Sequence, residues 1–361
     1  ATAVWGSQQV NLFEGAKYDG VFGMWYGKGP GVDRSMDVIR HANSAGTSKH
    51  GGVLVVAGDD HAAKSSSLPH QSEHMFIGAS IPVLNPANVQ EVLDLGIFGW
   101  ELSRYCGAWV ALKAITENMD SAISAEIDPK RVKIVIPENF ELPEDGVHIR
   151  WPDSALDQEL RLNKFKVYAA REFARANGLN KIVIDSNQPR LGIITTGKAY
   201  LDVLQALEDL GIDENKASQI GLRVLKIGMS WPLDPVACHQ FAEGLEEVLV
   251  VEEKRSIIED QLTGQFYNWP LDKRPRVIGE FDEEGRDLLP NLSELTPAMV
   301  ARVIAARIAR FYKDAVIEQR LSLYAHKEQI FSAPRNITHR TPHYCSGCPH
   351  SQSTRIPEGS R

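Results

Sequence analysis

The stretch Gly51-Gly52-Val53-Leu54-Val55-Val56-Ala57-Gly58-Asp59-Asp60 decides the fold class of this chain. Its middle is apolar without alternation, and glycines and aspartates bound it on either side. A strand with this pattern is buried on both faces, which is typical of a parallel sheet covered by helices. We therefore predict an α/β fold. Helices that alternate with strands are expected in the flanking sequence.

The residues around this strand continue the alternation through about residue 128. The expected elements are strands at 19–26, 81–86 and 108–115, a helix at 32–43, and a helix that Asn88 caps. Right-handed crossovers would join such strands into one parallel sheet.

A second α/β block is expected at 190–282. It contains predicted strands at 190–197, 222–227 and 247–253 and predicted helices at 199–210 and 236–244. The region 129–189 reads as a linker with an amphipathic helix at 155–177. The region 283–340 reads as a helical connection with one helix from Pro297 to about Ile330, after Thr296 as its cap.

Composition excludes several classes of function. The 361 residues suffice for two or three domains, and no stretch approaches the roughly 20 apolar residues that a membrane-spanning helix needs. A net charge of −8 with scattered basic residues argues against nucleic-acid binding. Four cysteines do not form a disulfide framework, so we expect a cytoplasmic protein in which Cys106 and Cys238 are buried.

Two loops are candidate binding sites. Gly27-Lys28-Gly29-Pro30-Gly31 joins a strand to a helix, where glycines allow a ligand to approach the backbone; the alternative is a tight turn. The loop from His61 to His74 follows a buried strand, at the sheet edge where ligands bind in parallel sheets. Its polar side chains could hold a carboxylate or carbonyl, or it could be a solvated loop. We expect Glu252-Glu253-Lys254-Arg255 to be charge-paired surface.

Cys345 and Cys348 form a Cys-x-x-Cys pair that Pro349-His350 follows. Two neighbouring thiolates can bind a metal or an iron–sulfur cluster, although a four-ligand site needs further ligands. Zinc and a cluster both remain open, whereas a thioredoxin-type motif would need a complete βαβ domain around it.

Several blocks together resemble one family, the fused indolepyruvate ferredoxin oxidoreductases of the thiamine-diphosphate-dependent 2-oxoacid:ferredoxin oxidoreductase superfamily. The blocks, in family order, are Trp5-Gly6-Ser7-Gln8-Gln9, Met24-Trp25-Tyr26-Gly27-Lys28-Gly29-Pro30-Gly31-Val32-Asp33-Arg34, Gly58-Asp59-Asp60-His61, His70-Gln71-Ser72-Glu73 and Tyr344-Cys345-Ser346-Gly347-Cys348-Pro349-His350. No single block is specific, but they span nearly the whole chain.

The resemblance implies a thiamine-enzyme-like architecture. Residues 1–128 would be a partial pyrimidine-binding domain, residues 190–282 a transketolase C-terminal-like domain, and residues 341–361 the start of a diphosphate-binding domain. The full protein would oxidatively decarboxylate an aryl pyruvate to acyl-CoA and pass electrons to ferredoxin. It would use thiamine diphosphate, Mg²⁺ and a 4Fe-4S cluster, and it would be a homodimer.

The resemblance also assigns roles to residues. Gly29, Pro30 and Gly31 match a loop beside the cofactor, and the loop with Ser66, His70 and Gln71 matches a segment that faces the substrate region. Cys345 and Cys348 match cluster ligands. The family's activating Glu would precede Ala1, and the magnesium motif would follow Arg361. We therefore interpret the chain as an internal fragment that is inactive when isolated.

Two alternatives remain. A thiamine-dependent transferase or decarboxylase without redox chemistry would also contain both α/β blocks, and its Cys pair would bind zinc or nothing. A non-catalytic scaffold subunit with the same fold would lack the activating Glu.

Overall fold

The first sheet forms around the apolar stretch at 52–58, in a computed structural model that describes residues 1–331 and 343–360. Its strand order is β1 (Phe22–Lys28), β2 (Gly52–Gly58), β4 (Val110–Ala114), β3 (Val83–Leu84) and β8 (Met229–Trp231). Strands β1 to β4 are parallel and β8 pairs antiparallel with β3. The predicted α/β class with parallel sheets is confirmed.

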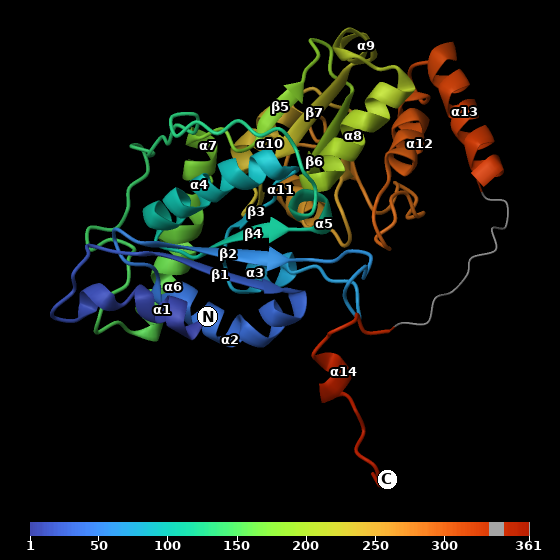
Figure 1. The fold of residues 1–361 in the computed structure, drawn as a ribbon. Coiled ribbons are helices and arrows are strands. Elements are labelled where there is room, and N and C mark those ends of the chain that lie inside the picture. The colour runs from blue at the N-terminus through green and yellow to red at the C-terminus, as the bar shows by residue number, and fades with distance from the viewer. Residues whose placement is uncertain (332–342, 361) are drawn as a thin grey trace. The chain divides into compact units, whose positions relative to one another are not determined.

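Both faces of this sheet are covered, which explains the unbroken apolar run in β2 (Figure 1). Val53 and Val55 pack with residues of α2 (Gly29–Ala45) and α3 (Glu73–Gly78). Leu54 packs on the opposite face with α4 (Val89–Cys106) and α7 (Val167–Ala176). The alternation of side chains along one strand therefore joins two separate apolar cores.

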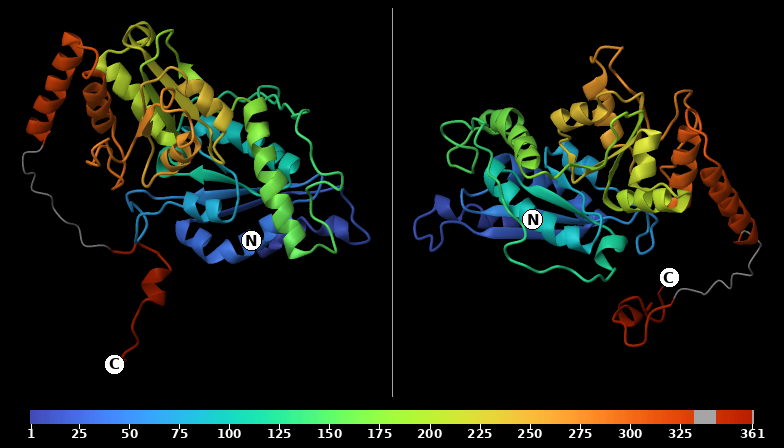
Figure 2. Two further views of the ribbon diagram at one scale, coloured as in Figure 1. Left: turned by 180° about the vertical axis from the view of Figure 1, so that it is seen from behind. Right: turned by 90° about the horizontal axis from the view of Figure 1, so that it is seen from above.

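The second sheet has the order β10 (Arg276–Ile278), β9 (Glu247–Val251), β6 (Leu191–Thr196), β7 (Leu222–Ile227) and β5 (Lys181–Ile184). Only β5 is antiparallel to its neighbour. Strand β5 lies inside the range predicted as a linker, yet it pairs with β7. Helices α10 (Pro235–Ala242) and α11 (Ile258–Phe266) pack on one face with Ile194 and Val248, and α8 (Gly197–Leu210) and α12 (Pro297–Ile308) lie on the other (Figure 2).

Most predicted helices are present. Asn88 caps α4 by accepting the Glu91 N–H at 3.0 Å, and the helix predicted at 155–177 runs as α6 (Ala155–Arg161), a π turn at Leu162–Lys166, and α7. Cys106 and Cys238 are buried, as expected. The remaining helical elements are α1 (Thr2–Ser7), η1 (Val10–Leu12), α5 (Thr116–Met119), α9 (Glu214–Ile220) and α14 (His350–Ser353).

The single helix predicted from Pro297 to about Ile330 is wrong. The structure has α12, capped by Thr296, and then a separate α13 (Ala315–Phe331). Asp314 starts the new helix because its carboxylate accepts the N–H groups of Val316 and Ile317 at 2.9 and 3.1 Å. The predicted boundary between residues 340 and 341 lies outside the described residues.

Residues 1–321 form one compact unit that contains both sheets, and residues 322–361 form another. Within the first unit, the chain passes from β7 directly into β8, so the second α/β block supplies the edge strand of the first sheet. The Asn85 N–H, just after β3, donates to the Gly228 carbonyl at 2.9 Å. None of the helices in the described parts of the chain combines the length and apolar character that a bilayer crossing requires.

Candidate functional site

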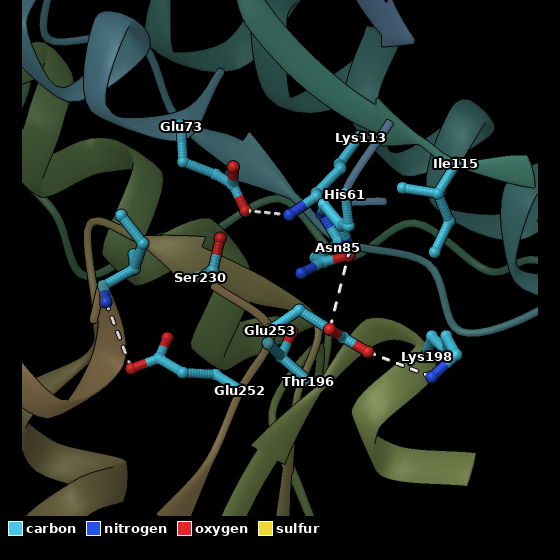
Figure 3. Close-up of a pocket in the computed structure, with 11 residues that line it drawn as sticks. His61, Glu73, Asn85, Lys113, Ile115, Thr196, Lys198, Ser230, Glu252 and Glu253 are labelled. Carbon is cyan, nitrogen blue, oxygen red and sulfur yellow. Dashed lines mark hydrogen bonds and ion pairs between the residues drawn. The ribbon is translucent and has the colours of Figure 1, made fainter. Parts of the chain in front are cut away.

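A cluster of buried polar side chains lies where strands of the two sheets end at their carboxyl edges (Figure 3). It encloses a cavity of about 10 Å³, roughly the space of one water molecule. The lining residues are His61, Glu73, Asn85, Lys113, Ile115, Thr196, Lys198, Ser230, Glu252, Glu253 and Ile257. Residues in β4, β6 and β8 thus meet residues that follow β2, β3 and β9.

The half of the cluster on the first sheet is a buried ion pair. Lys113, on β4, contacts Glu73 at the start of α3, and both are 4 % exposed. Burial alone would lower the pKa of Lys113, but the carboxylates of Glu73 and Asp59 outweigh it and the pKa is raised. Lys113 is therefore a buried ammonium group.

Asp59 completes this half of the cluster from the end of β2. Its carboxylate accepts the Ser72 N–H at 2.8 Å and the Ser72 hydroxyl at 2.6 Å. Burial and the nearby Glu73 carboxylate raise the pKa of Asp59 to about 6. Asp59 therefore titrates close to neutral pH.

His61 connects this half to the second sheet. Its Nδ1 lies 3.8 Å from a Glu253 carboxylate oxygen, and Glu253 also contacts the Lys198 Nζ at 3.0 Å. Burial, and then the positive charge of Lys113 and other lysines, lower the pKa of His61 to about 2. His61 is therefore a neutral imidazole. In the described part of the chain, neither its Nε2 nor Glu73 Oε2 has a hydrogen-bond partner, and both residues line the cavity.

Glu252 belongs to the second sheet and caps a helix. Its carboxylate accepts backbone N–H groups of Ile257, Ile258 and Glu259, at the beginning of α11, at distances of 2.9–3.1 Å. Burial raises the pKa of Glu252 to about 7. The expectation that Glu252 and Glu253 are exposed, charge-paired surface is therefore wrong, since each is 8 % exposed.

Two of the predicted loops lie against each other. Gly29, Pro30 and Gly31 begin α2, and a Cβ atom at Gly29 would lie only 2.2 Å from the ring of His70. The His70 Nε2 is 3.3 Å from a carboxylate oxygen of Asp33, in the first turn after that glycine loop. The structure therefore brings the predicted cofactor loop and the predicted substrate loop together.

The other predicted loop residues lie on the same segment. Asp60 holds its turn by accepting the N–H groups of Lys64 and Ser65, each at 2.8 Å, and Ser66 follows directly. Gln71 is bonded to the second α/β block: its side-chain amide donates to the Arg255 carbonyl at 2.9 Å and accepts the Arg255 N–H at 3.2 Å.

Cys345 and Cys348 lie in the second compact unit, in a turn closed by the Cys348 N–H bonded to the Cys345 carbonyl at 3.0 Å. Cys345 is exposed, Cys348 is half-buried, and both thiols are free. The Cys348 Sγ is 3.4 Å from His350 Nδ1. Two accessible thiols in one turn fit two ligand positions of a metal or cluster site, and further ligands would have to come from elsewhere.

Sequence reasoning missed Lys113, Lys198, Glu252 and Glu253 as members of the site. Glu252 and Glu253 carried an available signal, an acidic pair directly after a buried strand, which Asp59 and Asp60 also show.

A family model matches the part of the chain that forms the second sheet. Residues 180–333, which include the whole second sheet, match the family model described as the indolepyruvate ferredoxin oxidoreductase middle domain. The chain is related to the indolepyruvate ferredoxin oxidoreductases. The resemblance inferred from the sequence blocks is thereby confirmed.

Relatives match along most of the chain. Indolepyruvate oxidoreductase subunit IorA of Pyrococcus abyssi is 27% identical over 342 residues, covering 93% of this chain and 48% of the relative. The same subunit of Methanothermobacter marburgensis is 28% identical over 304 residues, covering 84% and 44%. The chain therefore spans about half the length of these curated relatives.

A solved structure shows a similar fold. It is a 2-oxoglutarate:ferredoxin oxidoreductase from Magnetococcus marinus, with a TM-score of 0.53 over 85% of this chain and 55% of that chain. At 15% sequence identity, this similarity concerns the fold alone. It supports the predicted thiamine-enzyme-like arrangement of parallel sheets.

Proposed function

We propose that this chain is part of a 2-oxoacid:ferredoxin oxidoreductase of the indolepyruvate type. The enzyme would oxidatively decarboxylate an aryl pyruvate to acyl-CoA and pass electrons through an iron–sulfur cluster to ferredoxin in the cytoplasm. The observation that carries this proposal is the match of residues 180–333 to the middle domain of that family, together with 27% identity to IorA along nearly the whole chain.

The domain assignment is part of the proposal. Residues 1–128 would be most of a pyrimidine-binding domain, 190–282 a transketolase C-terminal-like domain, and 341–361 the opening of a diphosphate-binding domain, in a parent protein that is a homodimer. The facing carboxyl edges of the two sheets support it, because parallel α/β sheets bind ligands at that edge.

The residues present are compatible with the expected cofactors. Gly29, Pro30 and Gly31 would lie beside thiamine diphosphate, whose Mg²⁺ motif we expect after Arg361. The contact between Gly29 and the His70 ring, which leaves no room for a Cβ, supports a role for glycine there. Cys345 and Cys348 would provide two thiolates for a 4Fe-4S cluster. When bound, thiamine diphosphate supplies the electron sink for decarboxylation.

The chain's own contribution is to place a dry, charged layer behind the loops that would face the ligand. His61, Lys113 and Glu73 leave space for only about one water molecule among them. Charges buried in this way are held in fixed positions and act at low local dielectric. His70 and Gln71 are half-buried on the loop that begins at His61, so the layer would fix the loop that contacts the 2-oxoacid.

The native gene product that contains this chain tests the proposal. Purified without oxygen, it should reduce a viologen dye in the presence of indole-3-pyruvate and coenzyme A, and it should show the visible absorption of an iron–sulfur cluster. Cys345→Ser with Cys348→Ser should abolish dye reduction and weaken the absorption, because two cluster ligands are lost. Ser346→Ala, in the same turn, is the matched control and should keep both.

A colourless native product, or one that reduces no dye with any 2-oxoacid, would contradict the proposal. Residues 1–361 alone should show no turnover, since the activating Glu and the magnesium motif are expected outside this sequence.

A further inference from the structure

An open cavity of about 400 Å³ lies beside the buried cluster, at the rim of the same sheet edge. Pro69, His70 and Gln71 line it from the loop after β2, and Lys254 and Arg255 line it from the segment after β9, with Asn291 completing the wall. The cavity is thus built by both α/β blocks, next to the glycine loop that contacts His70.

Two adjacent cations in this wall form no ion pair with any residue that the structure describes. The Lys254 Nζ donates to two carbonyl oxygens of the described chain, those of His61 at 3.2 Å and Ser293 at 3.5 Å. Among the described residues, no carboxylate forms an ion pair with Lys254 or with the exposed Arg255 guanidinium. This is unusual in a chain with a net charge of −8, where most buried or half-buried cations at this edge are paired.

Two of the carboxylates nearby are already engaged. Asp33 contacts His70 at 3.3 Å. Glu280 accepts the Ser256 N–H at 2.6 Å and the Asn291 side-chain amide at 3.0 Å. Among the described residues, Lys254 and Arg255 are therefore without a carboxylate partner, and an anionic ligand would provide one.

The main chain of Arg255 is also anchored. The side-chain amide of Gln71 forms two hydrogen bonds with the Arg255 backbone, so the guanidinium starts from an anchored main chain. A preorganised guanidinium presents paired N–H donors that match two oxygens of a carboxylate or a phosphate. The neighbouring ammonium group adds a point charge.

We propose that this cavity, lined by His70, Gln71, Lys254 and Arg255, binds the anionic oxygens of a small ligand. Resting on the proposed function, the inference names the carboxylate of the 2-oxoacid as that group, with Arg255 as its main partner and Gln71 as the positioning residue. The same donor groups would also bind a phosphate group, so the test compares a 2-oxoacid with phosphate.

Equilibrium binding to the purified chain measures the inference directly. Indole-3-pyruvate and inorganic phosphate are titrated separately and in competition, by calorimetry at low salt. Arg255→Gln should weaken binding of the anion roughly tenfold or more, since a charge-assisted hydrogen bond is lost. Arg255→Lys should recover part of the affinity, and Lys273→Gln, which removes an exposed charge elsewhere, should leave it within about twofold.

Equal affinity of the native chain and Arg255→Gln for both ligands overturns the inference. Phosphate binding that depends on Arg255, without binding or competition by indole-3-pyruvate, overturns the 2-oxoacid assignment and supports a phosphate ligand. Circular dichroism of each variant confirms that it is folded, which is expected because the Arg255 side chain is exposed.

Kinetics on the native gene product separate the inference from the proposed function. If the enzyme oxidises indole-3-pyruvate and Arg255→Gln raises KM at least tenfold with kcat little changed, both stand. Turnover with an unchanged KM in the variant refutes the inference alone. Absence of turnover, with anion binding that still depends on Arg255, refutes the proposed function alone.

Discussion

The buried cluster and the open cavity lie on the same sheet edge, but they differ in whether their cationic side chains contact carboxylates. In the cluster, Lys113 and Lys198 are enclosed and each contacts a carboxylate. In the cavity, Lys254 and Arg255 reach the surface without one. A buried unpaired charge is costly, whereas an exposed one is stabilised by water until a ligand replaces it. The difference indicates that the cluster holds the two blocks together and that the cavity is available for binding.

The largest expected effect comes from breaking the ion pair of the cluster. Lys113→Met would leave the Glu73 and Asp59 carboxylates buried side by side without a cation, and should lower the free energy of unfolding by about 3–5 kcal/mol. Urea denaturation followed by circular dichroism measures it.

The matched control is the double variant Lys113→Met with Glu73→Gln. Removing both charges should cost clearly less than the sum of the two single changes, because Glu73 then no longer carries a buried charge without its partner and only Asp59 remains without the Lys113 cation. Additive losses would mean that the pair does not interact in the folded protein. A corresponding change in the open cavity, Arg255→Gln, should shift stability by less than about 0.5 kcal/mol.

A smaller effect is expected where the glycine loop contacts the rim of the cavity. Gly29→Ala places a Cβ 2.2 Å from the His70 ring, so the ring or the loop must move. Overpacking of this kind costs roughly 1–3 kcal/mol. Gly31→Ala, two residues later, meets only Trp25 at 4.0 Å and is the control. Thermal denaturation of both variants measures the difference in their stability. Equal melting temperatures would show that the His70 ring moves aside without loss of stability.

Local signals in the sequence predicted most of the fold. The unbroken apolar run at 52–58 identified a doubly covered parallel strand, and Asn88 and Thr296 marked helix starts that the structure confirms. The break before α13 was not predicted, because residues 309–313 interrupt neither the apolar pattern nor the helix propensity, and the carboxylate of Asp314 decides it. The start or end of a helix can thus be predicted from the sequence only where residues with a strong preference for helix ends or turns mark it.

Part of the site could be predicted from the sequence. The contacts that could not be predicted join residues that are far apart along the chain. The loop from His61 to His74 was selected because it follows a buried strand, and the family resemblance assigned Ser66, His70 and Gln71 to the substrate region. That Glu253 lies 3.8 Å from His61, and that Gln71 is bonded to Arg255, depends on how the two sheets face each other. No spacing in the sequence encodes contacts between residues more than 180 positions apart. The acidic pair at 252–253 was therefore assigned to the surface although it is buried.

The smallest expected effect is a dependence of the free energy of unfolding on pH, which arises from His61 in the buried cluster. In the unfolded chain His61 gains a proton below pH 6.5, its ordinary pKa, whereas in the folded protein burial and neighbouring lysines hold its pKa at about 2. The unfolded state therefore binds more protons as pH falls, and the folded state loses up to about 1.4 kcal/mol per pH unit below 6.5. Asp59, with its pKa raised to about 6, acts in the opposite direction. Glu252, whose pKa burial raises to about 7, acts in the same direction as Asp59, so the raw stability curve mixes all three groups.

The difference between the native chain and His61→Gln isolates the histidine, because Asp59 is common to both. Between pH 7 and pH 5.5, the native chain should lose roughly 1–1.5 kcal/mol more than the variant, as measured by urea denaturation at each pH. Parallel curves for the native chain and His61→Gln would mean that His61 takes up a proton within the folded protein. The cluster would then be open to water, and the contrast with the cavity would disappear.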